Sequence, residues 1–158
     1  MSQKSAKIST VVSLILTFML LLALVYLTYW LPDVVESMID MKDNHFNTRA
    51  ELTETGRTLI LIDAYVMVAV AYIAVGFLFF LLRTVLRGEV FTKAATRLLT
   101  AVSWCCFAEG LLFILLAVQF QLAVAAAVAA CFLGLCLRVV KNVIEEAIRI
   151  KSENDFTI

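Results

Sequence analysis

Hydrophobic residues fill four long stretches of the chain, and polar residues gather between these stretches and at both ends. A helix that crosses the hydrocarbon core of a bilayer, about 30 Å thick, needs roughly 20 apolar residues. Each stretch reaches this length, so the pattern predicts an all-α integral membrane protein with four transmembrane helices. The predicted spans cover about residues 8–31, 59–82, 98–120 and 122–140.

The last two predicted spans are almost continuous, because only Gln119, Phe120 and Gln121 separate them. A single helix over both would be roughly 60 Å long at 1.5 Å per residue, which is twice the bilayer core. The chain must therefore turn back near 119–122, which predicts a tight helical hairpin. The whole chain then forms one four-helix membrane domain, which we expect to be a bundle.

Lysine and arginine are unevenly distributed among the segments outside these spans. Ten lysines and arginines lie at the N-terminus, in the connection at 83–97 and in the C-terminal segment from Arg138 onward, whereas the connection at 32–58 carries only three, together with six acidic residues. Basic loops stay on the cytoplasmic side, so we expect both termini to be cytoplasmic and the 32–58 connection to lie outside. Tyr26, Tyr29 and Trp30 end the first span, where this orientation places an aromatic belt.

Composition agrees with a membrane protein. Hydrophobic residues make up 63% of the chain and charged residues 16%, against about 45–50% and 25% in soluble domains. A small soluble domain cannot bury so much apolar surface, which excludes almost any soluble enzyme. The formal net charge is zero, so nothing indicates direct nucleic-acid binding. The first span lacks a small-residue cleavage site and is expected to be a retained anchor.

The outer connection begins with a proline. Pro32 suits the first position of a helix, and apolar residues follow it at helical spacing. We therefore expect a short, separate amphipathic helix that lies on the outer membrane surface. Its apolar face would consist of Val34, Val35, Met38 and Ile39.

Glu109 is the acidic residue nearest the middle of a predicted span. A charged carboxylate there costs at least about 2.5–3.5 kcal/mol, and no basic residue lies at its depth. We expect it to face the other helices, where Thr17 and Tyr72, counted to the same depth, are candidate hydrogen-bond partners. It is either a proton or ion site or a hydrogen-bonding group between helices. Asp63 lies about one turn from the outer interface and can reach water.

Small residues recur at helical spacing on the last two spans. Such residues let helix backbones approach closely inside a membrane. We expect the two stripes to meet inside the hairpin or to form the face of a homo-oligomer. The stripes are Ser103, Gly110 and Ala117 on the third span, and Ala126, Ala130 and Gly134 on the fourth.

The chain offers little for catalysis or metal binding. His45 is the only histidine, and a single histidine near acids is typical of a solvated loop rather than a metal site. The four cysteines all lie in predicted spans and form no C-x-x-C motif, so we expect them to act as small apolar side chains. No nucleotide-binding or hydrolase motif is present. We expect no cofactor, no metal and no enzymatic activity.

Two segments on the predicted cytoplasmic side stand out. Gly88 is placed to end the second helix and Thr92 to cap the third. This turn is either an ordinary basic loop or a surface for a cytoplasmic partner or anionic lipid headgroups. The tail continues as an apolar stripe over 139–148 with opposite charges at i, i+4. It either packs against neighbouring helix ends or is presented to another protein.

The same two segments carry motifs, Gly88-Glu89-Val90-Phe91-Thr92 in the turn and Glu153-Asn154-Asp155-Phe156-Thr157-Ile158 at the end. They resemble the G-x-P-F-T turn and E-x-D-L-T-I tail of a bacterial family of small four-span membrane proteins, two-nine-seven-five in the domain-of-unknown-function series. Val90 stands in place of the usual proline, and Phe156 in place of leucine. The resemblance implies a bacterial cytoplasmic membrane and a gene that often lies beside a helix-turn-helix regulator. The positions it implies for partner contact are Arg87, Gly88, Phe91, Thr92, Glu145, Glu146, Asp155, Phe156 and Ile158.

Three functional hypotheses follow. The first is a non-enzymatic membrane protein whose inner turn and tail bind or sequester a cytoplasmic partner such as a helix-turn-helix regulator. The second is a small proton or ion pathway that uses Glu109. The third is an immunity protein, in which the acidic outer connection meets a cationic membrane-active peptide.

Overall fold

The computed structural model describes residues 3–45, 54–88 and 91–155 of the chain. Within these residues the fold is all-helical, and each helix is long and apolar enough to cross a membrane. The predicted all-α fold is therefore confirmed for the described part, with four helices of the length and composition that a membrane span requires. The helices are α1 (Gln3–His45), α2 (Glu54–Leu86), α3 (Lys93–Ala117) and α4 (Ala123–Asp155).

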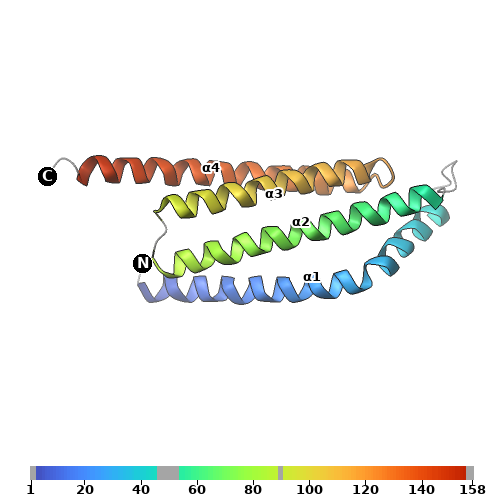
Figure 1. Cartoon of the computed structure of the whole chain (residues 1–158), viewed down its shortest axis with the longest axis horizontal. Coiled ribbons are helices and arrows are strands. Elements are labelled where there is room, and N and C mark those ends of the chain that lie inside the picture. The colour runs from blue at the N-terminus through green and yellow to red at the C-terminus, as the bar shows by residue number, and fades with distance from the viewer. Residues whose placement is uncertain (1–2, 46–53, 89–90, 156–158) are drawn as a thin grey trace.

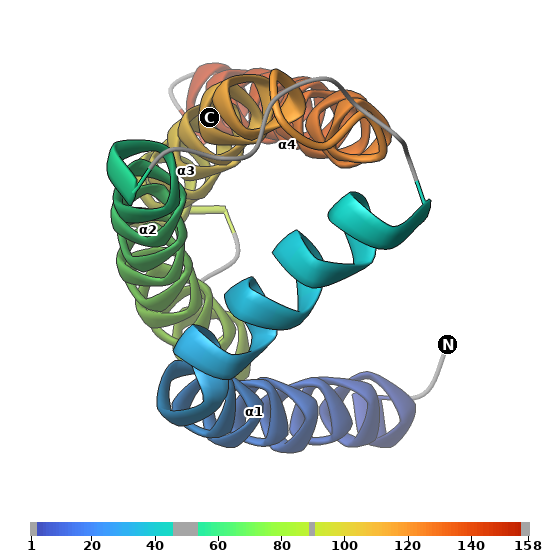
Figure 2. The same cartoon turned by 90° about the vertical axis from the view of Figure 1, so that its right-hand side faces the viewer.

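Consecutive helices lie side by side, and α1 begins at the same end of the molecule at which α4 ends (Figure 1). α1 packs on α2, α2 on α3 and α3 on α4, and no other pair of described helices is in close backbone contact. Viewed end-on, the helices follow an open arc (Figure 2). The bundle that we expected is therefore not closed, because α1 and α4 are not in close backbone contact within the described residues.

α1 continues as one helix through Pro32. Proline has no N–H to donate to the carbonyl of Thr28, and its ring crowds that carbonyl, so it bends a helix. α1 bends in its light-blue part, and its last turns run obliquely across the end of the molecule (Figures 1 and 2). The prediction that Pro32 starts a separate helix on the membrane surface is therefore wrong.

Burial in the protein explains why the helix continues. Val35 and Ile39 form a core with Ile60 of α2, and Ile39 is only 2% exposed. Val34 and Met38, the other members of the predicted apolar face, stay 38% and 43% exposed. The helical spacing was interpreted correctly, but the face packs on protein instead of lipid. The side chains packed against this core are Leu61, Ala64, Leu116 and Phe120.

The turn between α2 and α3 follows the sequence closely. Gly88 has a φ of 78°, a left-handed conformation that glycine adopts without strain. Its N–H donates to the carbonyl of Val85 at 3.0 Å, which ends α2. The hydroxyl of Thr92 accepts from the N–H of Ala95 at 3.3 Å and caps α3. Both predicted signals, the terminating glycine and the capping threonine, are confirmed.

α3 and α4 are joined by a turn between Ala117 and Ala123, where the chain was predicted to reverse. Ser103 is completely buried, and its hydroxyl donates to the backbone carbonyl of Gly134 at 2.9 Å. At Gly110, a Cβ atom would lie 2.6 Å from the sulfur of Cys131. The two backbones approach this closely only because glycine and serine occupy these positions.

On α4 the contact with α3 differs in part from the predicted stripe. Gly134 lies in it, but the helix continues the contact through Ala127 and Ala123, which are 3% and 8% exposed. Ala126 and Ala130 are only half-buried, as is Ala117 at the end of α3. Alanine fills most of the positions from 123 to 130 in α4, so several of its faces are equally small and the sequence does not distinguish them.

Candidate functional site

α4 extends beyond the length that a membrane requires. Its 33 residues make a helix about 50 Å long, against a hydrocarbon core of about 30 Å. Figure 1 shows it running past the start of α3. The residues after Val140 are the tail that the sequence placed outside the membrane, and we call 141–155 the α4 extension.

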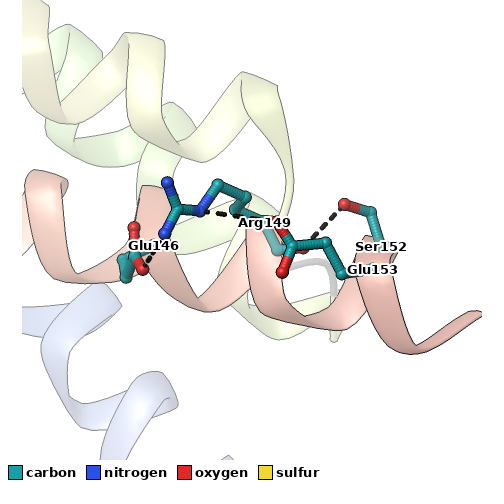
Figure 3. Close-up of polar contacts among 4 residues, drawn as sticks. All are labelled: Glu146, Arg149, Ser152 and Glu153. Carbon is teal, nitrogen blue, oxygen red and sulfur yellow. Dashed lines mark hydrogen bonds and ion pairs between the residues drawn. The ribbon is translucent and has the colours of Figure 1, made fainter.

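Ion pairs follow one another along the α4 extension. Lys141 contacts Glu145 at 2.6 Å, and Arg149 contacts Glu146 at 2.6 Å and Glu153 at 3.8 Å (Figure 3). The hydroxyl of Ser152 donates to the carbonyl of Arg149 at 2.7 Å. Each exposed pair contributes only about 0.3–0.5 kcal/mol. Together they favour the helical conformation of the extension of α4, a helix that packs on α3 alone among the described helices.

The apolar stripe of the α4 extension divides into two faces. Ile144, Ala147 and Ile148 are half-buried. Val143 and Ile150 are 64% and 51% exposed. One face is therefore turned toward neighbouring residues, as expected if the tail packs against helix ends. The other face leaves apolar side chains uncovered, as expected if the tail is presented to another protein.

A pocket of about 410 Å³ lies between the first turns of α3 and the α4 extension. It brings Glu145 beside residues at the end of the predicted connection 83–97. Sequence reasoning did not single out its α3 members, Lys93, Thr96 and Arg97. The sequence did contain a signal for these residues. The short connection after α2 and the predicted hairpin between α3 and α4 together place the start of α3 between the end of α2 and the α4 extension. The lining residues are Lys93, Thr96, Arg97, Glu145, Ile148, Arg149 and Ser152.

The residues of the inner turn have different surroundings. Arg87 is exposed and lines a second pocket with Arg97, while Phe91 is 58% exposed. Gly88 and Thr92 serve the local backbone, as described above. Glu145 and Glu146 are ion-paired within the α4 extension. The side chain of Asp155 and the residues Phe156 and Ile158 lie outside the described part of the structure.

The predicted partners of Glu109 lie elsewhere. Tyr72 forms a hydrogen bond at 3.0 Å with the hydroxyl of Thr28, and Thr17 donates to the carbonyl of Ser13 at 2.8 Å. Thr17 is three helical turns from Thr28, about 16 Å along α1. The prediction that Thr17 and Tyr72 lie at one depth is therefore wrong, because counting along each span ignores how far neighbouring helices are offset.

Two acidic side chains lie between the helices without partners. The Oε1 atom of Glu109 and the Oδ2 atom of Asp63 are buried, and neither has a hydrogen-bond partner among the described residues. They belong to the adjacent helices α3 and α2. The expectation that Asp63 reaches water does not hold for this oxygen. An unpaired buried carboxylate oxygen is costly, so both groups are candidates for function.

An aromatic and cationic cluster joins α3 and α4 where the α4 extension begins. The guanidinium carbon of Arg138 lies 4.7 Å from the centre of the Trp104 ring and 5.7 Å from that of Phe107. A Cβ atom added to Gly134 would approach the Phe107 ring to 3.1 Å. Sequence reasoning missed this cluster, although an arginine opposite a tryptophan near a span end is a recognisable pair.

Other chemistry is sparse in the part of the chain that the structure describes. No group of three or more metal-binding side chains occurs there. The cysteines Cys105, Cys106, Cys131 and Cys136 are free thiols. The side chain of His45 and residues 46–53 lie outside the described part, so the immunity hypothesis, which depends on the outer connection, stays a prediction.

Comparison with known families decides the relationship. The model of a family described as "Protein of unknown function (DUF2975)" matches residues 39–158. The chain belongs to the DUF2975 family. The match includes both the turn at Gly88–Thr92 and the tail, so the resemblance of these segments is confirmed. It begins at Ile39, within the last turns of α1, and the family has no known function. No match was found among curated proteins or among solved structures.

Proposed function

We propose that this DUF2975 member is a non-enzymatic multi-pass membrane protein that binds a cytoplasmic partner protein through the α4 extension. The observation that carries the proposal is the uncovered apolar face of this extension, with Val143 and Ile150 more than half exposed. Apolar side chains along one face of a helix are a common recognition surface for a partner protein. The ion pairs fold the helix before the partner arrives, which lowers the entropic cost of binding.

The family resemblance suggests the class of partner, a helix-turn-helix transcription regulator. The protein would then act by sequestration, holding the regulator at the membrane until a signal changes the arrangement of the helices. The pocket between α3 and the α4 extension supports this coupling, because movement of α3 changes the surroundings of Glu145 and Arg149 directly.

Replacing Ile150 by aspartate is expected to abolish partner recovery. A charge in the centre of an apolar contact costs about 2 kcal/mol or more, which corresponds to at least roughly thirtyfold weaker binding. The measurement is the amount of the regulator encoded beside the gene that co-purifies with the tagged full chain from native membranes. Removal of residues 153–158 should likewise release the regulator without affecting insertion.

The matched control is Met38→Asp, which places the same charge at a 43% exposed apolar position at the opposite end of the molecule. This variant should retain the regulator. Equal recovery with Ile150→Asp and wild type would refute the proposal, as would loss of recovery with both variants.

A second candidate function is favoured by the unpaired oxygens of Asp63 and Glu109. Two acidic groups on adjacent helices supply the elements of a proton or cation pathway. Vesicles that contain the wild-type chain should then conduct protons above the level of protein-free vesicles. Glu109→Gln keeps the shape of the side chain and removes its charge, so flux should fall to the protein-free level.

Glu36→Gln serves as the control for the flux measurement, because it removes an acid from the exposed outer part of α1. Flux should be unchanged in this variant. Absence of flux in the wild type would discard the pathway and leave the two acids as groups that hold helices together.

A further inference from the structure

Three arginines line one pocket where α2 ends and α3 begins. Arg83 lies in the last turn of α2, Arg87 directly follows that helix, and Arg97 lies in the second turn of α3. The pocket has a volume of about 510 Å³. Its remaining lining is mostly apolar or small and consists of Phe80, Thr84, Ala94 and Leu98.

No described residue balances the charges of this pocket. Among the described residues, no acidic side chain forms an ion pair with any of its three arginines. Glu89, the one acid of the short connection, lies outside the described residues. The neighbouring α4 extension differs, because its basic residues Lys141 and Arg149 are paired with glutamates. Three guanidinium groups that have no ion pair with a described residue repel one another around this pocket, and a bound anion would relieve that repulsion.

The position of the pocket indicates which anion it takes. Phe80 lies near the end of the predicted second span and Leu98 at the start of the third. Arg83 and Arg87 come after the second span and Arg97 directly before the third, so all three lie outside the predicted hydrocarbon core. Phe80 is 55% exposed, so its ring is available to an acyl chain. Guanidinium groups bind phosphate oxygens in bidentate geometry. Basic pockets between membrane helices at the cytoplasmic face suit anionic lipid headgroups.

We propose that the pocket binds the phosphate headgroup of an anionic phospholipid of the inner leaflet. Arg83, Arg87 and Arg97 donate to the phosphate oxygens, and the first carbons of an acyl chain lie along Phe80 and Leu98. The lipid then bridges α2 and α3 at the turn between them. This site is separate from the exposed apolar face of the α4 extension to which the partner is proposed to bind, although Arg97 also lines the pocket between α3 and that extension.

The test compares lipid retention by the full chain in detergent micelles, counted by native mass spectrometry. Wild type should retain phosphatidylglycerol in preference to phosphatidylcholine. The double variant Arg83→Gln/Arg97→Gln should retain it at least about tenfold less, since each charged hydrogen bond contributes about 1.5–3 kcal/mol. The control Lys141→Gln/Arg149→Gln removes the same charge from the α4 extension and should change retention less than about twofold, as for surface charges.

Further variants and a competition with phosphate test the bidentate geometry and the need for an acyl chain. Arg83→Lys/Arg97→Lys keeps the charge and loses the bidentate geometry, so its retention should be intermediate, and it replaces the glutamine variant if that variant does not fold. Inorganic phosphate should not displace the lipid, because it lacks the acyl chain. Displacement by inorganic phosphate, equal loss in the control, or equal retention of the two lipids by wild type would overturn the proposal. Ile150→Asp should leave lipid retention unchanged.

Discussion

Replacing Gly110 by leucine is expected to destabilise the chain by about 3 kcal/mol, at the upper end of the usual cost of overpacking. A Cβ atom at this position would lie 2.6 Å from the sulfur of Cys131 and 3.4 Å from the backbone carbonyl oxygen of Ala127. The sulfur can rotate away, but the backbone of α4 cannot. Leucine therefore forces the two helices apart and also weakens the buried hydrogen bond from Ser103 to Gly134.

The measurement for Gly110→Leu is the free energy of unfolding in mixed detergent micelles. Gly76→Leu is the matched control, since it adds the same side chain to a glycine of α2 at which an added Cβ atom would have no neighbour within 4 Å. It should leave stability unchanged or raise it by up to about 1 kcal/mol, the helix-propensity gain over glycine. Gly110→Ala should cost far less than leucine. Unfolding of both leucine variants at the same denaturant level would contradict the close α3–α4 contact.

Ile39→Ala is expected to lower the free energy of unfolding by about 2–5 kcal/mol, the range found for large-to-alanine changes in well-packed cores. Ile39 is 2% exposed and lies at the centre of the core that ties the outer part of α1 to α2. Ile39 lies beyond the predicted first span, where its surroundings outside the protein would be aqueous. Its side chain therefore contributes both by being removed from water and by filling space in the core. Amide hydrogens of residues 33–40 should then exchange faster.

Met38→Ala provides the control for Ile39→Ala, because Met38 is 43% exposed on the same turn of α1. Its effect should stay within about 0.5 kcal/mol, as for most surface changes. If Ile39→Ala and Met38→Ala had equal small effects, the last turns of α1 would not be held by the core described above.

The sequence predicted the features that depend on one helix at a time. Apolar length determined the four helices, and the backbone needs of a helix end determined the roles of Gly88 and Thr92. The reversal near 119–122 followed from bilayer thickness alone. These predictions succeed because the residues that determine each feature lie within a few helical turns of it in the sequence.

Features that depend on how two helices are placed against each other were predicted less well. Thr17 and Tyr72 were expected at one depth, whereas Tyr72 contacts Thr28. Pro32 was expected to separate two helices, but packing of Val35 and Ile39 on Ile60 keeps them joined with a bend. Helix offset and burial against a distant segment leave no local mark in the sequence.

In the candidate site too, features within one helix were predictable from the sequence and features between helices were not. The exposed charges of the α4 extension and their i, i+4 pairing follow directly from sequence spacing. Arg97, which lines both pockets, and the cluster of Arg138 with Trp104 arise only when α3 is placed between α2 and α4. The pockets therefore depend on the arrangement of three helices, which no single segment of the sequence encodes.

Thiol labelling of intact cells tests the central claim most directly, which is that the helices cross the membrane and leave the α4 extension in the cytoplasm. The background is a variant with its four cysteines replaced, to which Met38→Cys or Ser152→Cys is added, both at exposed positions. A membrane-impermeant maleimide should label Met38→Cys in intact cells, and Ser152→Cys only after permeabilisation. Labelling of Ser152→Cys in intact cells would contradict the orientation and, with it, the proposed partner and lipid sites.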